Sequence, residues 1–260
     1  MKTGSGAAFY QRDGDAFIPS ELTRGPWDPR AQHAGPPSAL LGSAVEAEGT
    51  LIGRITIEVL RPVPLAPLEV ASEVVRPGRN VELVEAAMTA AGADPRPVAR
   101  AVAWRLRTDG GVASLDAGLP PPAPEAGRER PFFATGEEIG YHTAMDYRFL
   151  DGAFIEPGPA RVWLRMRQPL VAGEPTSPLA RVLVAADSGN GVSAALDYRR
   201  HLFINTELTV HLVREPAGEW VHLDAVTYVG PHGIGLAESV LWDETGRLGS
   251  AAQTLLVRRR

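Results

Sequence analysis

The chain has 260 residues, 44% hydrophobic and 22% charged, with a formal net charge of −5. This length suffices for two cores of ordinary size, and the negative charge gives a nucleic-acid-binding role no electrostatic support. There is no cysteine, which excludes disulfides, thiolate metal ligands and a cysteine nucleophile. The N-terminus lacks the apolar core of a signal peptide, and no apolar run approaches membrane-spanning length. We therefore expect a soluble, cytoplasmic protein with no membrane or nucleic-acid partner.

The first 110 residues predict one helix followed by an antiparallel sheet. Residues 7–19 predict a hairpin, with a turn at Asp13-Gly14. Pro36-Pro37 suits the first turn of a helix, which we expect over residues 38–48 with Gly49 ending it. Proline and glycine then separate four strand-like runs, at residues 52–61, 67–76, 80–91 and 98–107. This α+β pattern predicts a curved sheet wrapped around the helix.

The rest of the chain predicts a linker and a second unit of the same kind. Residues 111–133 are rich in proline and show no periodicity, so we expect them to link residues 1–110 to residues 134–260. In the second unit we expect two helical segments, at residues 176–186 and 192–200. Strands are expected at residues 141–149, 161–168, 205–214, 219–229, 233–242 and 247–257.

The two units repeat each other in sequence. Residues 55–61 match residues 208–214, and residues 81–85 match residues 234–238; both offsets are 153, and the apolar positions stay in phase. Such a register across several elements indicates an internal duplication. We expect a pseudo-dimer within one chain, with the two sheets joined edge to edge so that neither joining edge is exposed.

One polar pair breaks the symmetry of the repeat. Asp187 ends an apolar run and precedes a glycine-rich turn, so we predict that it lies just before a helix N-terminus, where negative charge is favoured. In the repeat alignment Asp187 corresponds to Ala34. The turn before the last strand is three residues shorter in the second unit, and Gln253 then corresponds to Ala103. Only the second unit therefore carries the polar pair. The alternative is that Asp187 caps a helix and Gln253 is an ordinary strand residue.

A helix wrapped by an antiparallel sheet, present twice, resembles the double hot-dog acyl-CoA thioesterases, of the thioesterase II type and its actinobacterial thioesterase-like branch. The resemblance covers residues 16–258. It implies a tandem hot-dog fold with two long helices, hydrolysis of acyl-CoA in fatty acid metabolism, no metal or other cofactor, and assembly as a homo-oligomer. It also implies a site of three residues in the second half. Asp187 and Gln253 match the first and last of them, while the middle one, Thr or Ser in the family, is Asn205 here, with Thr206 beside it.

The chemistry of such a site needs a positioned water, a base and donors for the oxyanion. We expect Asp187 to orient and deprotonate the water, and Gln253 with Asn205 or Thr206 to hold it. The backbone N–H groups of Gly189, Asn190 and Gly191 are the expected oxyanion donors.

Two other functions stay open at this point. Hot-dog hydratases use an Asp and a His five residues apart, as Asp28 and His33 are, although the Asn-Pro expected between them is missing. His33 could also lie near the cleft without that role. Alternatively, Asn205 in place of a hydroxyl favours a protein that binds acyl thioesters without cleaving them. No serine-hydrolase elbow, phosphate-binding loop or chelating histidine spacing is present.

Overall fold

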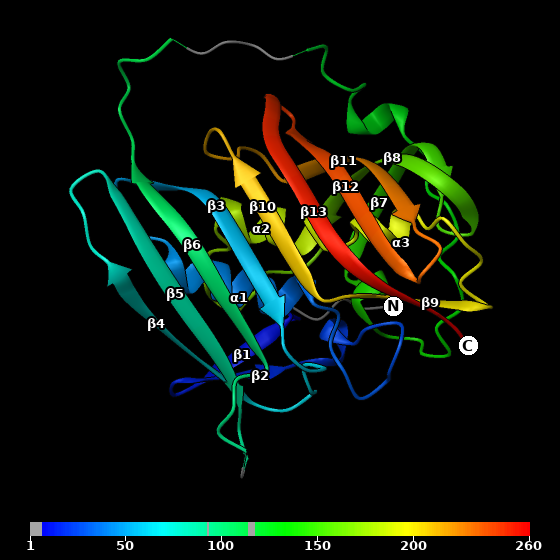
Figure 1. Ribbon diagram of the computed structural model, residues 1–260, viewed down its shortest axis with the longest axis horizontal. Helices are drawn as coiled ribbons and strands as arrows, with labels where there is room; N and C mark the ends of the chain where they lie inside the picture. The colour runs from blue at the N-terminus through cyan, green and yellow to red at the C-terminus, as the bar shows by residue number, and fades with distance from the viewer. Residues whose placement is uncertain (1–6, 93, 114–117) are drawn as a thin grey trace.

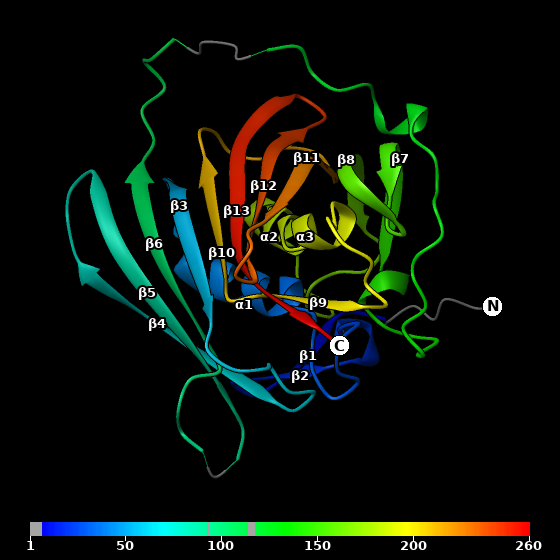
Figure 2. The same ribbon diagram turned by 45° about the vertical axis from the view of Figure 1, so that its right-hand side comes forward.

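The structure is a computed structural model, and it describes residues 7–92, 94–113 and 118–260. Its strands join in one antiparallel sheet that curves around the helices (Figures 1 and 2). The longest helix in the described part of the chain has eleven residues, and no helix there is long and apolar enough to cross a membrane.

Each half contributes a hairpin, then a helix, then four strands of the sheet, and the second half adds the short helix α3 and the strand β9. The first half consists of β1 (Tyr10–Asp13), β2 (Ala16–Pro19), the 3-10 turn η1 (Glu21–Thr23), α1 (Gly35–Val45), β3 (Thr50–Val59), β4 (Leu68–Arg76), β5 (Val81–Ala90) and β6 (Ala99–Arg107). The second consists of the 3-10 turns η2 (Pro124–Ala126) and η3 (Tyr141–Thr143), then β7 (Met145–Ala153), β8 (Glu156–Met166), α2 (Pro178–Ala186), α3 (Gly189–Val192), β9 (His201–Asn205), β10 (Glu207–Leu212), β11 (Trp220–Val229), β12 (Ile234–Asp243) and β13 (Gly246–Arg259).

The sheet has a pseudo-two-fold axis at its centre. Its strand order is β1-β2-β4-β5-β6-β3-β10-β13-β12-β11-β8-β7, with β9 paired to β13 off this path. The order reads the same way outward from the central pair β3–β10, with β6 corresponding to β13, β5 to β12 and β4 to β11. The two halves therefore join edge to edge, as the repeat predicts.

The register confirms the sequence offset in the strands. Thr56 faces Thr209 in the β3–β10 pair, and these two residues are 153 positions apart. On either side of this pair, Val102 faces Thr56 and Ala252 faces Thr209. Gln253 therefore corresponds to Ala103, as the sequence comparison expects.

Helices α1 and α2 pack against each other on the concave side of the sheet (Figure 2). Both are apolar on nearly all sides, which is the pattern of a buried helix. A Cβ on Gly35 would lie 2.8 Å from the carbonyl oxygen of Val184, and one on Gly42 would collide with the Leu183 side chain. Glycine at these two positions lets the helix backbones approach closely.

The expected helices are only partly correct. The first begins at Gly35 and has eleven residues, and the second, nine residues long, is followed by the four-residue α3 instead of a single long helix. The helix expected at residues 192–200 is wrong, because that segment is irregular and leads into β9. Asp187 consequently lies at the C-terminal end of α2, not before the N-terminus of a long helix.

The linker expected at residues 111–133 is largely irregular where the structure describes it, and residues 114–117 lie outside the described part. Its end packs on the second half: the Trp163 indole donates to the carbonyl oxygen of Pro122 at 2.8 Å, and Arg128 pairs with Phe149. From residue 118 on, the linker descends beside β7 and β8 (Figure 1). The domain boundaries at residues 110 and 134 stay a prediction.

Candidate active site

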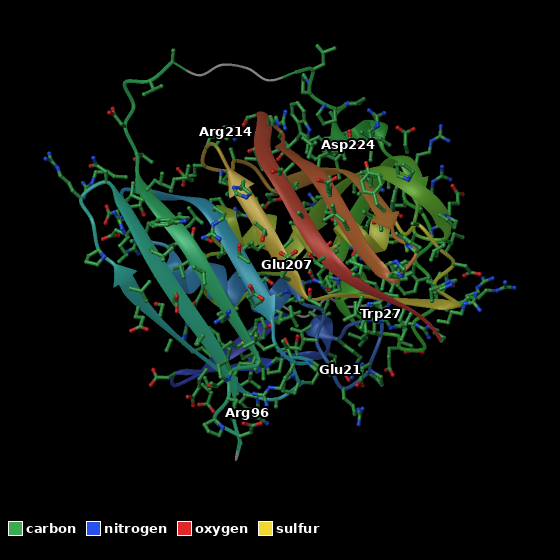
Figure 3. All side chains as sticks on the ribbon, viewed as in Figure 1. Glu21, Trp27, Arg96, Glu207, Arg214 and Asp224 are labelled. Carbon is green, nitrogen blue, oxygen red and sulfur yellow. The ribbon has the colours of Figure 1, made fainter. Side chains whose placement is uncertain are left out.

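A cleft of about 470 Å³ opens where β3 ends and β9 leads into β10. Its walls come from the loop before α1, from residues 59–63 after β3 and from β9, with Asp187 and Asn190 at its inner side. Trp27, one of its lining residues, lies near β9 at the lower end of the sheet, and Arg214 lies at the opposite end (Figure 3). Both halves of the chain therefore build this cleft.

The Asp187 carboxylate is the centre of a hydrogen-bond network. It is only 3% exposed. Its Oδ1 accepts from Asn205 Nδ2 at 2.8 Å and from Gln253 Nε2 at 3.1 Å, and its Oδ2 lies 2.9 Å from His33 Nδ1. A buried carboxylate needs such partners, because burial without them is costly. The structure therefore brings together three residues that the sequence singles out in the second half, and it adds His33 from the first.

Gln253 holds the turn between α2 and α3 in place. Its side chain is 1% exposed. Besides Asp187 Oδ1, its Nε2 lies 3.2 Å from the Asp187 carbonyl oxygen, while its Oε1 accepts from the Asn190 N–H at 3.1 Å. These contacts are to Asp187, at the end of α2, and to Asn190, in α3, so Gln253 sets the position of both residues.

His33 is held from three sides. Its ring stacks on Tyr141 with centroids 3.7 Å apart and planes 5° apart. The Tyr141 hydroxyl donates in turn to the carbonyl oxygen of Val184 at 2.7 Å, and the Gly35 amide lies 3.2 Å from His33 Nδ1. The 2.9 Å contact with Asp187 needs one proton between the two atoms. In the tautomer with its proton on Nδ1, His33 donates to Asp187 instead of accepting from Gly35, and Nε2 is left as an acceptor.

The structure separates the two candidates for the middle position. Asn205 is half-buried and contacts Asp187 directly. Thr206 is exposed, and its hydroxyl donates to the carbonyl oxygen of Thr254 at 3.3 Å, away from the carboxylate. Both line the cleft, but only Asn205 belongs to the Asp187 network.

The backbone amides expected as oxyanion donors are mostly engaged. The Asn190 N–H donates to Gln253, and the Gly191 N–H donates to the Ser188 carbonyl oxygen at 3.0 Å. The Asn190 side chain, in contrast, lines the cleft and makes no hydrogen bond to the described residues. The oxyanion role expected for Gly189, Asn190 and Gly191 stays a prediction.

Asp28 and His33 do not act as a pair in this structure. Arg30 contacts both carboxylate oxygens of Asp28 at 3.1 Å, and these hydrogen bonds lower the pKa of Asp28. His33 contacts Asp187 instead. The spacing that resembles the hydratases is therefore not matched by a contact between the two side chains.

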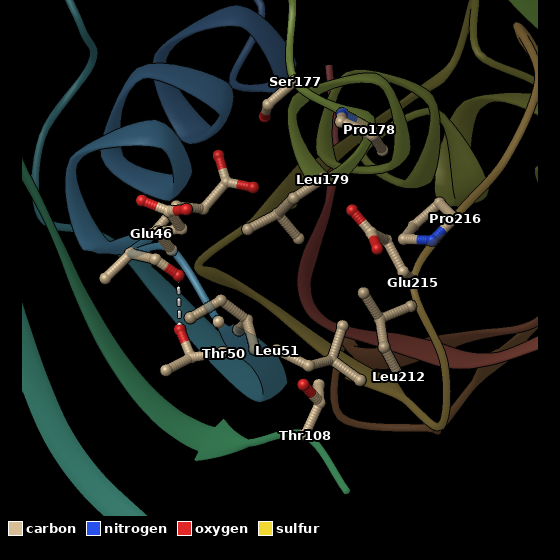
Figure 4. A pocket seen from close by; sticks show the side chains of 14 residues that line it. Glu46, Thr50, Leu51, Thr108, Ser177, Pro178, Leu179, Leu212, Glu215 and Pro216 are labelled. Atoms are coloured by element: carbon tan, nitrogen blue, oxygen red, sulfur yellow. Dashed lines mark hydrogen bonds between the residues drawn. The ribbon is translucent and has the colours of Figure 1, made fainter. Parts of the chain in front are cut away.

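A second cleft, of about 550 Å³, occupies the pseudo-symmetric position at the far end of β10 (Figure 4). Glu46 follows the last residue of α1, as Asp187 follows the last residue of α2, so Glu46 and not Ala34 is the counterpart of Asp187. The pKa of the Glu46 carboxyl is raised, mainly by burial. The hydrogen bond with the Ser177 hydroxyl acts in the opposite direction, and the nearby Glu215 carboxylate adds to the increase. With Ala103 in place of Gln253, this cleft lacks the amide that holds the Asp187 carboxylate in the first cleft.

Comparison with known proteins agrees with this architecture. The family model of the acyl-CoA thioesterase N-terminal domain matches residues 23–106, and that of the C-terminal domain matches residues 116–257. The fold is similar to that of a candidate thioesterase II from Thermobifida fusca, with a TM-score of 0.74, 17% identity, and 96% of this chain and 94% of that chain covered. No curated protein matches the chain in sequence.

Two further solved structures are similar. One is a protein of unknown function with a hot-dog fold from Alicyclobacillus acidocaldarius, with a TM-score of 0.71, 17% identity, and 96% and 94% of the two chains covered. The other is an acyl-CoA thioesterase II from Mycobacterium marinum, with a TM-score of 0.65, 18% identity, and 95% and 94% covered. These likenesses show the hot-dog fold.

Proposed function

This chain belongs to the acyl-CoA thioesterase family, and we propose that it hydrolyses an acyl-CoA thioester to a free acid and coenzyme A in the cleft around Asp187. The observation that carries the proposal is the convergence of His33, Asn205 and Gln253 on one buried carboxylate at the wall of an open cleft. A cleft lined by apolar groups with a few convergent polar side chains is the usual form of a small-molecule site.

We assign the proton transfer to His33 and the orienting role to Asp187. The sequence leads to Asp187 as the base, but its buried carboxylate is already contacted by the side chains of His33, Asn205 and Gln253. Of these three, only the His33 imidazole can take up a proton from a water and pass it on. His33 keeps Nε2 as an acceptor, and its ring lines the cleft. An imidazole oriented by a carboxylate through Nδ1 is an established arrangement for a general base.

The Asn190 side chain supports the developing negative charge. Asn190 and His33 line the same cleft, and the Asn190 amide group has no acceptor among the described residues. An asparagine amide aimed at the carbonyl oxygen is a known kind of oxyanion donor. Gln253 fixes the backbone of Asn190, so the same side chain positions the carboxylate and the oxyanion donor.

The reaction then needs no group beyond these and water. His33 Nε2 takes a proton from the water as its oxygen adds to the thioester carbon, and Asn190 binds the resulting oxyanion. When the oxyanion collapses, the carbon–sulfur bond breaks, and the protonated His33 returns its proton to the leaving thiolate. The products are the free acid and the thiol. Cytoplasmic location and homo-oligomeric assembly stay predictions.

Thiol release from acetyl-, butanoyl-, octanoyl- and palmitoyl-CoA tests this proposal. The wild type should release thiol, and Asp187→Asn and His33→Gln should each lower kcat by about 10²–10⁴-fold. Asn190→Ala should lower it by about 10²–10³-fold. His201→Gln, which changes a histidine that does not line the cleft, is the control and should keep full activity.

Other outcomes would favour the other functions. Absence of thiol release, together with a melting temperature raised by acyl-CoA, would show a binding protein. Hydration of an enoyl-CoA that is lost in both Asp28→Asn and His33→Gln would establish the hydratase. Full activity of Asp187→Asn would contradict the site.

A further inference from the structure

A small cavity of about 30 Å³ lies behind the active-site cleft. Its lining is mostly aromatic: Trp27, Phe132, Phe133, Tyr141, Tyr147 and Phe154. Trp27, His33 and Asn190 line both this cavity and the cleft, so the base and the oxyanion donor lie at the boundary between them. We call this small cavity the aromatic chamber.

The two cavities fit the two arms of a thioester. The coenzyme A arm is long and polar, and only the cleft of about 470 Å³ has room for it. The reacting carbonyl must lie against His33 and Asn190, which places the acyl arm on the other side of these residues, in the aromatic chamber. The chamber has room for roughly two water molecules, or for a small alkyl group of similar size.

The chamber walls are packed tightly enough to limit its size. The Phe132 ring lies 4.3 Å from Phe133 and 4.5 Å from Phe154, and Tyr147 lies 4.8 Å from Phe154, measured between ring centroids. Four of these residues, Phe133, Tyr141, Tyr147 and Phe154, are buried. A longer acyl chain would have to displace packed rings, which costs free energy because protein interiors have little spare volume.

The wall is also fixed relative to the reacting atoms. Tyr141 stacks on His33, and its hydroxyl is held by the carbonyl oxygen of Val184 and the Ser188 hydroxyl, at 2.7 and 2.9 Å. Both contacts tie the ring to the end of α2, next to Asp187. The depth available beyond the carbonyl is therefore set by the structure of the site itself.

We propose that the protein selects short acyl groups, about acetyl to butanoyl, and that Phe132 and Phe133 at the end of the linker set this limit. This inference rests on the proposed function and adds its substrate class. One extra methylene in a fitted apolar pocket changes kcat/KM by about 10-fold or more. We therefore expect kcat/KM for octanoyl-CoA to be at least about 10-fold below that for butanoyl-CoA.

The test combines turnover with binding. In the wild type and in Phe132→Ala, kcat/KM is measured with acetyl-, butanoyl-, octanoyl- and palmitoyl-CoA. Phe132 is only half-buried, so its truncation is tolerated better than that of its buried neighbours. The variant should gain about 10-fold on octanoyl-CoA relative to acetyl-CoA. Phe149→Leu is the matched control, because Phe149 packs on Phe154 but does not line the chamber, and its chain-length order should stay that of the wild type.

Calorimetric binding of the same acyl-CoAs to Asp187→Asn separates the two proposals. A wild type most active on octanoyl- or palmitoyl-CoA, or a Phe132→Ala variant with an unchanged order, would overturn the chamber and leave hydrolysis intact. Tighter binding of butanoyl- than palmitoyl-CoA without turnover in the wild type would support the chamber and contradict hydrolysis. Binding that is equal for all chain lengths would overturn the chamber, whatever the activity.

Discussion

Thr56 and Thr209, which are 153 residues apart, face each other at the pseudo-two-fold axis with their hydroxyl oxygens 3.0 Å apart. Thr209 donates its hydroxyl proton to Glu207 at 2.9 Å, so Thr56 is the donor between the two, and Thr56 accepts from Arg54 at 3.0 Å. One chain of hydrogen bonds therefore runs from a cation on β3 to a carboxylate on β10. It joins the two halves at the only strand pair they share along the central path of the described sheet.

This chain of hydrogen bonds predicts coupling between the two threonines. Thr56→Val and Thr209→Val should each lower the free energy of unfolding by about 1 kcal/mol, because each leaves a polar partner unpaired. The double variant should cost less than the sum of the two, since it removes both partners. Urea unfolding of the four proteins measures this difference. Strictly additive losses would show that the contact contributes nothing.

The middle position of the site gives a second prediction. Asn205→Ala should lower kcat by about 10²-fold, because it removes a donor that orients the Asp187 carboxylate. Thr206→Val should leave kcat within about twofold, since its hydroxyl contacts only the backbone of Thr254 and a surface substitution of this kind has little effect. Steady-state thiol release distinguishes the two. The opposite ranking would assign the position to Thr206.

The close approach of α1 and α2 gives a third prediction. A Cβ on Gly35 would lie 2.8 Å from the Val184 carbonyl oxygen and 3.2 Å from His33 Nδ1. Gly35→Ala should therefore cost about 1–3 kcal/mol of stability and reduce turnover by displacing His33. Gly191→Ala is the control for stability, because nothing lies within 4 Å of its Cβ position. Equal stability of both variants in thermal unfolding would contradict the contact.

A fourth prediction concerns acid stability, through His222. Burial beside Trp163 lowers its pKa from 6.5 to about 4, with Arg161 adding to the effect, and neither ring nitrogen has a partner among the described residues. His222 therefore takes up a proton more readily in the unfolded chain than in the folded protein. Its contribution to the free energy of unfolding is fully present above about pH 6.5 and is lost as the pH falls toward 4.

The size of this effect can be measured. Between about pH 7 and about pH 5, His222 should remove about 2 kcal/mol from the free energy of unfolding. His222→Gln should lose this dependence, whereas His211→Gln, at an exposed position, should keep it. Denaturant unfolding at the two pH values makes the comparison. An unchanged dependence in His222→Gln would exclude this histidine as the cause.

The strands and their symmetry could be read from the sequence, but the helices could not be aligned. Strand patterns repeat in the same order because paired strands must keep register. With a turn three residues shorter before the last strand, this correctly related Gln253 to Ala103. The helices break the offset, because four residues, 46–49, connect α1 to β3, whereas twenty, 187–206, separate α2 from β10, the counterpart of β3. A change in connection length leaves no trace in periodicity, so Asp187 was aligned with Ala34 and not with Glu46.

The site residues were found only in part, and for a similar reason. Asp187, Asn205 and Gln253 lie in one half and follow its internal order. The contact between His33 and Asp187 joins the two halves, and the sequence signals it only through a histidine just before the first helix. The aromatic chamber was not foreseen, because Phe132 and Phe133 belong to a linker with no periodicity. Contacts between distant segments are set by packing, which a single sequence does not display.

The unequal clefts at the two ends of the β3–β10 pair also bear on how the two halves of the chain can evolve. In an assembly of two identical chains, every substitution appears twice, so a residue cannot be kept in one cleft and discarded in the other. Here the two halves are encoded separately, and selection acts on each alone. His33 can be retained on the first copy and Gln253 on the second, while the opposite cleft carries Ala103 and Glu46. Fusion of the halves is therefore what permits this protein to specialise one cleft.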